Sequence, residues 1–284
     1  MYVIAGVTGH VGSIVAEQLL AQGQKVRVVV RDEAKGATWS RKGAEVALGT
    51  LEDQAFLTSA LGGAGGFFTL LPPSFVVSDF YAYQQRTSDA IAGAVAASGT
   101  PHVVLLSSVG ADLLDGTGPI KGLHYLEEAL RTAGTKLTAI RAGYFQENIA
   151  NALGPARHAG VFPSFVSSAD FPMPMIATQD IGALAARSLL SPPAHSEIID
   201  LHGPAYSMRQ LAEKLGDALN QTLRVIDIPP RGWVEAMMQG GMPKHIAEVF
   251  AEMYSAFAAG IIRPKGDRME QGKTTIDEVI KTLV

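Results

Sequence analysis

Short runs of β-branched residues alternate with longer amphipathic or alanine-rich segments over the first 140 residues of the chain. The apolar runs predict strands at residues 2–5, 25–30, 44–48, 66–70, 102–106 and 136–140. The segments between them predict helices at residues 11–22, 33–42, 52–61, 78–97 and 122–133. Glycines stand just after four of these helices, where C-caps are expected, at Gly23, Gly43, Gly99 and Gly134. This alternation predicts an α/β fold, with a doubly wound parallel sheet covered by helices on both faces.

The alternation loosens after about residue 150, where prolines interrupt it. A helix at residues 178–190 and a strand at 197–201 predict that the chain returns to the sheet over about residues 176–203. Further helices are expected at residues 207–220, 233–259 and 275–283. We therefore predict a sheet domain over residues 1–150. Residues 151–284 are expected to form a smaller, mostly helical C-terminal lobe for a substrate or a partner.

Cysteine is absent from the 284 residues, which excludes a disulfide scaffold, a thiolate zinc site and a cysteine nucleophile. The seven histidines are scattered without HxH or HExxH spacing, so no metal site is expected. The net charge is −4, and no cluster of Lys and Arg predicts binding to nucleic acid or to an anionic membrane surface. Glycines and prolines break the charge-free stretches 54–78 and 90–111, so neither predicts a membrane span. We expect a soluble, cytoplasmic protein.

A glycine-rich segment, Gly6-Val-Thr-Gly-His-Val-Gly12, lies between the first expected strand and the first expected helix. A Rossmann dinucleotide site needs glycines there for a tight turn, for close approach of the backbone to a pyrophosphate and for packing of helix on strand. The helix N-terminus adds free N–H groups and the positive end of the helix dipole. The alternative is a purely structural turn. We predict cofactor contacts from this loop and the first helical turn, at Gly6, Thr8, Gly9, His10, Val11 and Gly12.

Arg31 directly follows the second expected strand, where a dinucleotide-binding fold reads the adenosine ribose. An arginine there pairs with the 2′-phosphate of NADP, whereas an acidic residue accepts from the 2′-OH of NAD. Asp32 comes next, so both interpretations stay open, and Lys35 adds a second cation. We favour NADP(H) over NAD(H), with Arg31 and Lys35 as contacts; the alternative for both residues is an ordinary solvated loop.

Several motifs resemble the NmrA-like branch of the atypical short-chain dehydrogenases. GVTGHVG is similar to that family's GxTGxxG loop, VVVRD to its NADP-selecting strand end, and IRAGYFQEN at residues 140–148 to its RpGfF-x-EN signature. The resemblance implies an NAD(P)-binding domain at residues 1–150, a small variable C-terminal lobe and a cofactor cleft between them. It implies cofactor contacts from Thr50, which stands where relatives have an Asp, and from the loop at Leu71 and Pro72. Ser107 and Ser108 end a strand, where doubly wound folds bind ligands, and are predicted as further contacts.

The catalytic tyrosine of typical short-chain dehydrogenases has no counterpart, since no Tyr-x-x-x-Lys pair occurs in the chain. His124, four residues before Glu128, stands where reductase relatives often have a lysine, and a histidine there is similar to the quinone-reductase subgroup. We predict His124 as a proton donor and Tyr144 as a hydrogen-bond donor. The alternatives are a half-exposed helix residue for His124 and a packing residue for Tyr144. Glu128 and Arg141 are expected to form a structural ion pair.

The leading hypothesis is an NADPH-dependent oxidoreductase that transfers a hydride to a quinone-like or other aromatic acceptor. The rival is a non-catalytic NADP(H)-sensing regulator, which the resemblance implies equally and which the missing Tyr-x-x-x-Lys pair favours. A sugar- or lignan-type short-chain enzyme is disfavoured by the same missing pair. Methionines and aromatic residues at helical spacing, such as Met173, Met175, Trp233 and Met237, are more typical of a core than of a pocket, so none is predicted as a site residue. The identity of the acceptor, a homodimer and a protein partner stay open.

Overall fold

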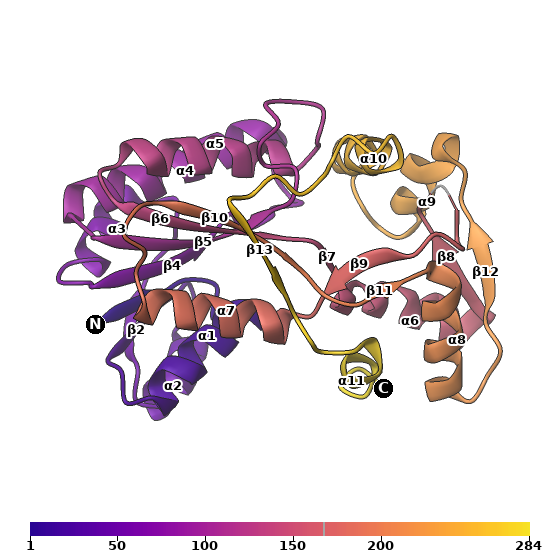
Figure 1. Ribbon diagram of the computed structural model, residues 1–284, viewed down its shortest axis with the longest axis horizontal. Coiled ribbons are helices and arrows are strands. Elements are labelled where there is room, and N and C mark those ends of the chain that lie inside the picture. The colour runs from indigo at the N-terminus through magenta and orange to yellow at the C-terminus, as the bar shows by residue number, and fades with distance from the viewer. Residues whose placement is uncertain (167) are drawn as a thin grey trace.

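The computed structural model describes residues 1–166 and 168–284, and its main feature is an eight-stranded sheet in which every neighbouring pair of strands is parallel (Figure 1). The strand order is β13-β10-β6-β5-β4-β1-β2-β3. The strands are β1 (Tyr2–Ile4), β2 (Val26–Val30), β3 (Glu45–Leu48), β4 (Gly66–Leu70), β5 (His102–Ser108), β6 (Lys136–Ala142), β10 (Glu197–His202) and β13 (Arg268–Gln271). This architecture confirms the predicted doubly wound α/β fold.

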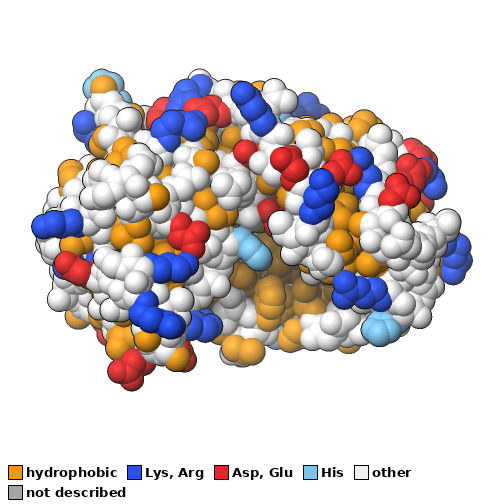
Figure 2. All heavy atoms as spheres, turned by 90° about the horizontal axis from the view of Figure 1, so that it is seen from below, with side chains coloured by type: hydrophobic (Ala, Val, Ile, Leu, Met, Phe, Trp, Pro, Cys, Tyr) orange, Lys and Arg blue, Asp and Glu red, His pale blue; other side chains and the backbone are white. Residues whose placement is uncertain are grey.

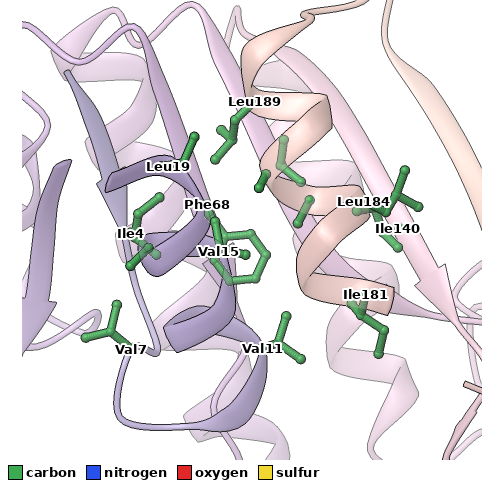
Figure 3. Close-up of a cluster of buried hydrophobic side chains, with 14 of the residues drawn as sticks. Ile4, Val7, Val11, Val15, Leu19, Phe68, Ile140, Ile181, Leu184 and Leu189 are labelled. Atoms are coloured by element: carbon green, nitrogen blue, oxygen red, sulfur yellow. The ribbon is translucent and has the colours of Figure 1, made fainter. Parts of the chain in front are cut away.

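Helices cover both faces of the sheet, with α1, α2 and α7 below it and α4 and α5 above it in Figure 1. The helices are α1 (His10–Ala21), α2 (Glu33–Arg41), α3 (Gln54–Ala60), α4 (Phe80–Ser98), α5 (Ile120–Thr132) and α7 (Thr178–Leu190). Val15 of α1 and Leu184 of α7 pack with Phe68 on one face (Figure 3). Val103 and Leu105 face the opposite core beneath α3, α4 and α5. Successive strand residues thus enter different cores, which explains why these strands are apolar along their whole length.

The ends of the predicted helices have the local chemistry that the sequence indicates. Asp32, Asp53 and Asp79 are the N-caps of α2, α3 and α4, and each carboxylate accepts a backbone N–H from the first helical turn. The four glycines expected after helices have positive φ angles, between 65° and 89°, which confirms them as left-handed positions: Gly23, Gly43, Gly99 and Gly134.

A smaller lobe lies beyond the carboxyl ends of the strands (Figure 1). It contains helices and two small sheets, ordered β11-β9-β7 and β12-β8. Its elements are β7 (Tyr144–Phe145), η1 (Gln146–Ala152), α6 (Leu153–Ala159), β8 (Val161–Ser164), β9 (Met173–Ile176), β11 (Ala205–Tyr206), α8 (Met208–Leu219), β12 (Arg224–Asp227), η2 (Pro230–Gly232), α9 (Trp233–Gln239), α10 (Lys244–Ala258) and α11 (Ile276–Ile280). Segments from before and after α7 and β10 therefore build one lobe.

Two features of this half differ from the sequence-based expectation. The single helix predicted over residues 233–259 is wrong, because the chain forms α9 and α10 with a break at residues 240–243. Gly241 has a φ of 93° and Pro243 follows two residues later, so a continuous helix cannot pass through. The second feature is β13, which pairs with β10 at the edge of the main sheet and which the sequence did not indicate. No helix in the described part of the chain is long and apolar enough to cross a lipid bilayer.

Candidate functional site

The glycine loop lies at the point where the strand order reverses. From β1 the chain proceeds to β2 and β3 on one side, and then returns to β4 on the other side. In doubly wound sheets ligands bind outside the carboxyl ends of the strands at such a switch point. Gly6 has a φ of 68°, and a Cβ atom there would lie 2.5 Å from Cδ2 of Leu70, at the end of β4. The turn is closed by a hydrogen bond of 2.9 Å from the amide of Gly9 to the carbonyl oxygen of Gly6.

Gly12 brings helix α1 against this turn. A Cβ atom on Gly12 would lie 2.5 Å from the carbonyl carbon and oxygen of Gly6 and 2.6 Å from the carbonyl oxygen of Ala5. Thr8, Gly9 and His10 are exposed, whereas Val11 and Gly12 are buried. The loop therefore presents its backbone and the side chains of Thr8 and His10 to solvent, while its helix lies in close contact with the end of β1.

The N-terminus of α1 differs from those of the three helices that follow it. Gly9 is its N-cap, no side chain caps it, and its first turn carries no acidic residue. The first N–H groups of a helix have no partner within the helix, and they carry the positive end of its dipole. In α2, α3 and α4 an aspartate accepts from these groups, whereas in α1 they are available to an anion from outside.

Arg31 and Lys35 are exposed at the end of β2 and in the first turn of α2. Between them, Asp32 is the N-cap of α2, and its Oδ1 atom accepts the backbone N–H of Lys35 at 2.9 Å. The carboxylate that left the cofactor preference open in the sequence is thus bound to its own helix. The side chain of Arg31 is exposed, and within residues 1–166 and 168–284 its guanidinium has no hydrogen bond or ion pair.

The remaining predicted cofactor contacts lie along the same edge of the sheet. Thr50 follows β3, Leu71 and Pro72 follow β4, and all three are half-buried. Ser108 ends β5 with its hydroxyl donating to the carbonyl oxygen of Val109 at 3.0 Å. Because the strands are parallel, these residues lie in a row at the carboxyl edge. Between β2 and β6 this edge spans four strand spacings of about 4.8 Å.

A buried ion pair lies below this edge and corrects the predicted pairing of Glu128 with Arg141. Arg141 of β6 instead donates to Glu127 through two nitrogens, at 3.0 Å and 2.7 Å, and both side chains are almost fully buried. The hydroxyl of Ser107 also donates to Glu127, at 2.6 Å. Glu128 is exposed and lies 3.5 Å from Arg131. The hydroxyl of Ser107 therefore donates its hydrogen to Glu127. A contact of Ser107 with a cofactor, as predicted, would need the hydroxyl oxygen to act as an acceptor.

A cavity of about 450 Å³ opens between the sheet edge and the small lobe. Val109 after β5, Gly143 after β6 and His202 at the end of β10 form its sheet side. The lobe supplies mainly aromatic and aliphatic groups: Tyr144, Phe165, Val166, Ser168, Phe171, Met173, Pro174, Tyr254, Phe257, Ala258, Gly260, Ile262 and Pro264. Viewed from below, the molecule is hollowed between its two halves, and hydrophobic side chains line the hollow (Figure 2). The volume and lining are typical of a small-molecule site.

Two tyrosines supply hydroxyl groups to this apolar wall. Burial raises the pKa of Tyr144 well above its usual range, and the neighbouring Tyr254 raises it further, whereas a hydrogen bond with Asn148 opposes the shift. Burial also raises the pKa of Tyr254. Tyr254 is stacked on Phe165, with ring centroids 5.6 Å apart and planes inclined by 18°. The wall therefore combines flat aromatic surface with phenol groups that stay protonated.

The two histidines near the site have different surroundings. His124 is half-buried on α5, and its Nδ1 atom lies 2.9 Å from the carbonyl oxygen of Ala111. It is not among the described residues that line the cavity. His202 does line the cavity, and its Nδ1 atom lies 3.3 Å from the carbonyl oxygen of Glu270. A carbonyl oxygen can only accept, so in both side chains Nδ1 carries the hydrogen and Nε2 is the nitrogen left for other contacts.

The sequence pointed to Tyr144 but not to the rest of this wall. Met173, which we did not select, lines the cavity, whereas Met175, Trp233 and Met237 are buried in the core. Tyr254 and the other aromatic residues of the wall carry no motif, and helical spacing alone does not separate a cavity wall from a core. Within residues 1–166 and 168–284, no group of three or more His, Cys, Asp or Glu side chains could hold a metal ion.

Comparison with known proteins agrees with this architecture. The NmrA-like family matches residues 2–280 of the chain. NAD(P)H azoreductase of Xenophilus azovorans is 26% identical over 267 residues, which cover 92% of this chain and 90% of the relative. Quinone oxidoreductase 2 of Escherichia coli (strain K12) is 27% identical over 259 residues, which cover 89% and 86%.

Solved structures have the same fold over the full length. The triphenylmethane reductase of Citrobacter sp., complexed with NADP(H), superimposes with a TM-score of 0.84 at 18% identity and 100% coverage of both chains. An NADPH-dependent quinone oxidoreductase from Escherichia coli, complexed with NADPH, has a TM-score of 0.79 at 23% identity, with 100% of this chain and 99% of the other covered.

Proposed function

Because the chain belongs to the NmrA-like family, we propose that it is an NAD(P)H-dependent oxidoreductase that reduces a quinone-like or dye-like aromatic acceptor. The observation that carries the proposal is the position of one apolar, aromatic cavity on the same sheet edge as the glycine loop. Relatives over nearly the whole chain are an NAD(P)H azoreductase and a quinone oxidoreductase, which supports an acceptor of this class.

The chain has the groups that a dinucleotide needs. The uncapped N-terminus of α1 would receive the pyrophosphate, and the close fit of Gly6 and Gly12 supports backbone contacts rather than side-chain contacts at that point. The carboxyl edge from β3 to β5 would hold the rest of the dinucleotide, with Thr50, Leu71, Pro72 and Ser108 along it. A reduced nicotinamide supplies a hydride, and reduction of a quinone to a hydroquinone takes that hydride and one proton.

NADPH is the favoured cofactor, because Arg31 is free to meet a 2′-phosphate while Asp32 is bound to its own helix. Replacement of Arg31 by Ala is expected to raise the Kd for NADPH by about 10- to 100-fold, which corresponds to one lost charge-assisted contact. The Kd for NADH should stay the same. Arg41→Ala, at an exposed position on the last turn of α2, is the matched control. Equal losses for both nucleotides in Arg31→Ala would refute the assignment.

The acceptor would occupy the cavity, where Tyr144 can donate a hydrogen bond to a carbonyl oxygen. His124 remains a candidate proton donor through Nε2, which carries a hydrogen when both ring nitrogens are protonated, although it stands on α5 outside the lining. His124→Gln should lower kcat and flatten its pH dependence if the imidazole delivers the proton. An unchanged pH profile would leave His124 as a helix residue that holds the Ala111 loop.

The direct test is anaerobic oxidation of NADPH against a panel of quinones and azo dyes, together with NADPH binding by calorimetry. We expect saturable turnover with at least one quinone. Tight NADPH binding without turnover of any acceptor would overturn the oxidoreductase proposal and favour the NADP(H)-sensing regulator. Absence of NADPH binding would overturn both.

A further inference from the structure

The cavity wall has an unusual charge composition for a protein surface. Among its described lining residues, none is Asp, Glu, Lys or Arg, and the polar groups are Ser168, His202 and the two phenols of Tyr144 and Tyr254. All other lining residues are apolar or glycine. An ion that enters this space therefore meets no opposite charge among the described lining residues.

Three charged residues stand next to lining residues in the sequence. Asp170, directly before Phe171, pairs with Arg209 at 2.6 Å. Residues 260–265 run along the cavity, and Gly260, Ile262 and Pro264 contribute to its lining. Arg263, between the latter two, donates to the carbonyl oxygen of Gly260. Lys265 pairs with Asp112 at 3.2 Å. Both cations therefore have partners within the protein, and the guanidinium of Arg263 stands beside Gly260, a residue of the cavity lining.

From this arrangement we infer that the site discriminates against anionic aromatic acceptors and accepts uncharged ones. The inference rests on the proposed function, and it names the acceptor class more narrowly. An anion in the cavity would lose its hydration without gaining an ion pair, which is strongly unfavourable. The aromatic rings add to this effect because their faces carry partial negative charge. An uncharged quinone loses little hydration and can accept hydrogen bonds from the phenols of Tyr144 and Tyr254.

The test compares 1,4-naphthoquinone with 1,4-naphthoquinone-6-sulfonate, which share one ring system; the second carries a permanent negative charge on the benzene ring, away from the quinone carbons. The assay is anaerobic NADPH oxidation at about pH 8, where histidine side chains are ordinarily neutral, corrected for the reaction without enzyme. We expect kcat/KM to be at least about 100-fold lower for the sulfonate, the size of effect that an unpaired buried ion produces. Equal values for the two quinones would overturn the inference and leave the proposed function intact. Absence of turnover with both quinones and with the wider panel would instead overturn the proposed function.

A cation placed in the wall should reverse the preference. Phe171 is 69% exposed and lines the cavity, so Phe171→Lys adds a positive charge there at little cost to folding. We expect the ratio of kcat/KM for the sulfonate to that for the neutral quinone to rise at least about 10-fold. Phe257→Lys, from the other side of the wall at 39% exposure, should act in the same direction.

Ile261→Lys is the matched control, because Ile261 is 53% exposed and is not among the described lining residues. It changes the net charge equally, so it reports any general attraction of anions to a less negative protein. The ratio should stay at the wild-type value in this variant. An equal rise in all three variants would overturn a charge filter in the cavity, as would no rise in either Phe171→Lys or Phe257→Lys when both proteins are folded by circular dichroism.

Discussion

Replacement of Gly12 by Ala tests the close contact between α1 and the turn after β1. The added Cβ atom would lie 2.5 Å from backbone atoms of Gly6 and 2.6 Å from the carbonyl oxygen of Ala5, and ordinary contact begins at 3.4 Å. Backbone cannot rotate away as a side chain can, so the helix has to move by about 1 Å. That movement is opposed by α7, where a Cβ atom on Gly182 would already lie 2.5 Å from Ile14 of α1.

Two effects set the expected change in stability. Overpacking of this kind costs about 1–3 kcal/mol, and Ala is preferred over Gly within a helix by about 1 kcal/mol. We therefore expect a net loss of up to about 2 kcal/mol in the free energy of unfolding, which lowers Tm by up to about 4 °C for a chain of this size. Displaced N–H groups at the N-terminus of α1 should also raise the Kd for NADPH at least about 10-fold.

Gly9→Ala separates the two effects. A Cβ atom there would lie 3.5 Å from the carbonyl oxygen of Gly6, an ordinary contact, and φ is −105°, which any residue can adopt. Its Tm should stay within about 1 °C of wild type, while NADPH binding is weakened because the methyl group stands where the pyrophosphate approaches. Differential scanning fluorimetry and calorimetric titration measure both quantities. Wild-type Tm and Kd in Gly12→Ala would refute the reasoning.

Further predictions concern buried ionisable groups away from the cavity. Burial lowers the pKa of His102 to about 4, with Lys136 acting in the same direction and Glu197 against it. The unfolded chain, at about 6.5, then binds more protons between pH 6.5 and pH 4, so the free energy of unfolding should fall by about 3 kcal/mol as pH is lowered through this window. Urea unfolding at several pH values should show this slope in wild type and a smaller one in His102→Gln. Glu127→Gln should lower stability by about 3 kcal/mol, because it removes the carboxylate that binds buried Arg141 through two hydrogen bonds and leaves only the longer contact with Asp112, at 3.9 Å. The neighbouring exposed Glu128→Gln should change stability by less than about 0.5 kcal/mol, and similar losses in both variants would contradict the assigned pairing.

The sheet domain was predictable because its local signals agree with each other. Apolar runs, aspartate caps and positive-φ glycines mark the same boundaries from β1 to β6. Strand β13 gives no such signal. Its sequence, Arg-Met-Glu-Gln, is polar because it is an edge strand, and Arg268 pairs with Glu197 of β10 instead of entering the core.

Sequence patterns predicted the part of the candidate site that is built from backbone, but not the cavity wall that is built from side chains. The glycine loop depends on backbone geometry, which leaves a pattern of glycines in the sequence. The cavity wall depends on which side of a helix or strand faces the cleft, and Tyr254 differs from a core tyrosine only in this respect. The partner of Arg141 was mispredicted for the same reason. Glu127 and Glu128 are neighbours on α5, but successive residues of a helix point in different directions, so Glu127 is buried and Glu128 is exposed.

The way the chain is threaded through the small lobe has a consequence for ligand binding. The chain leaves the sheet for the lobe after β6, returns at α7, leaves again after β10, returns at β13 and leaves once more to form α11, which packs in the core of the lobe. Two lobes joined by one hinge loop can rotate apart freely. Here five chain segments pass between the sheet domain and the small lobe, and each limits the rotation that the others would allow. We therefore expect the cleft to be largely formed before a ligand enters it, so that binding orders little of the protein.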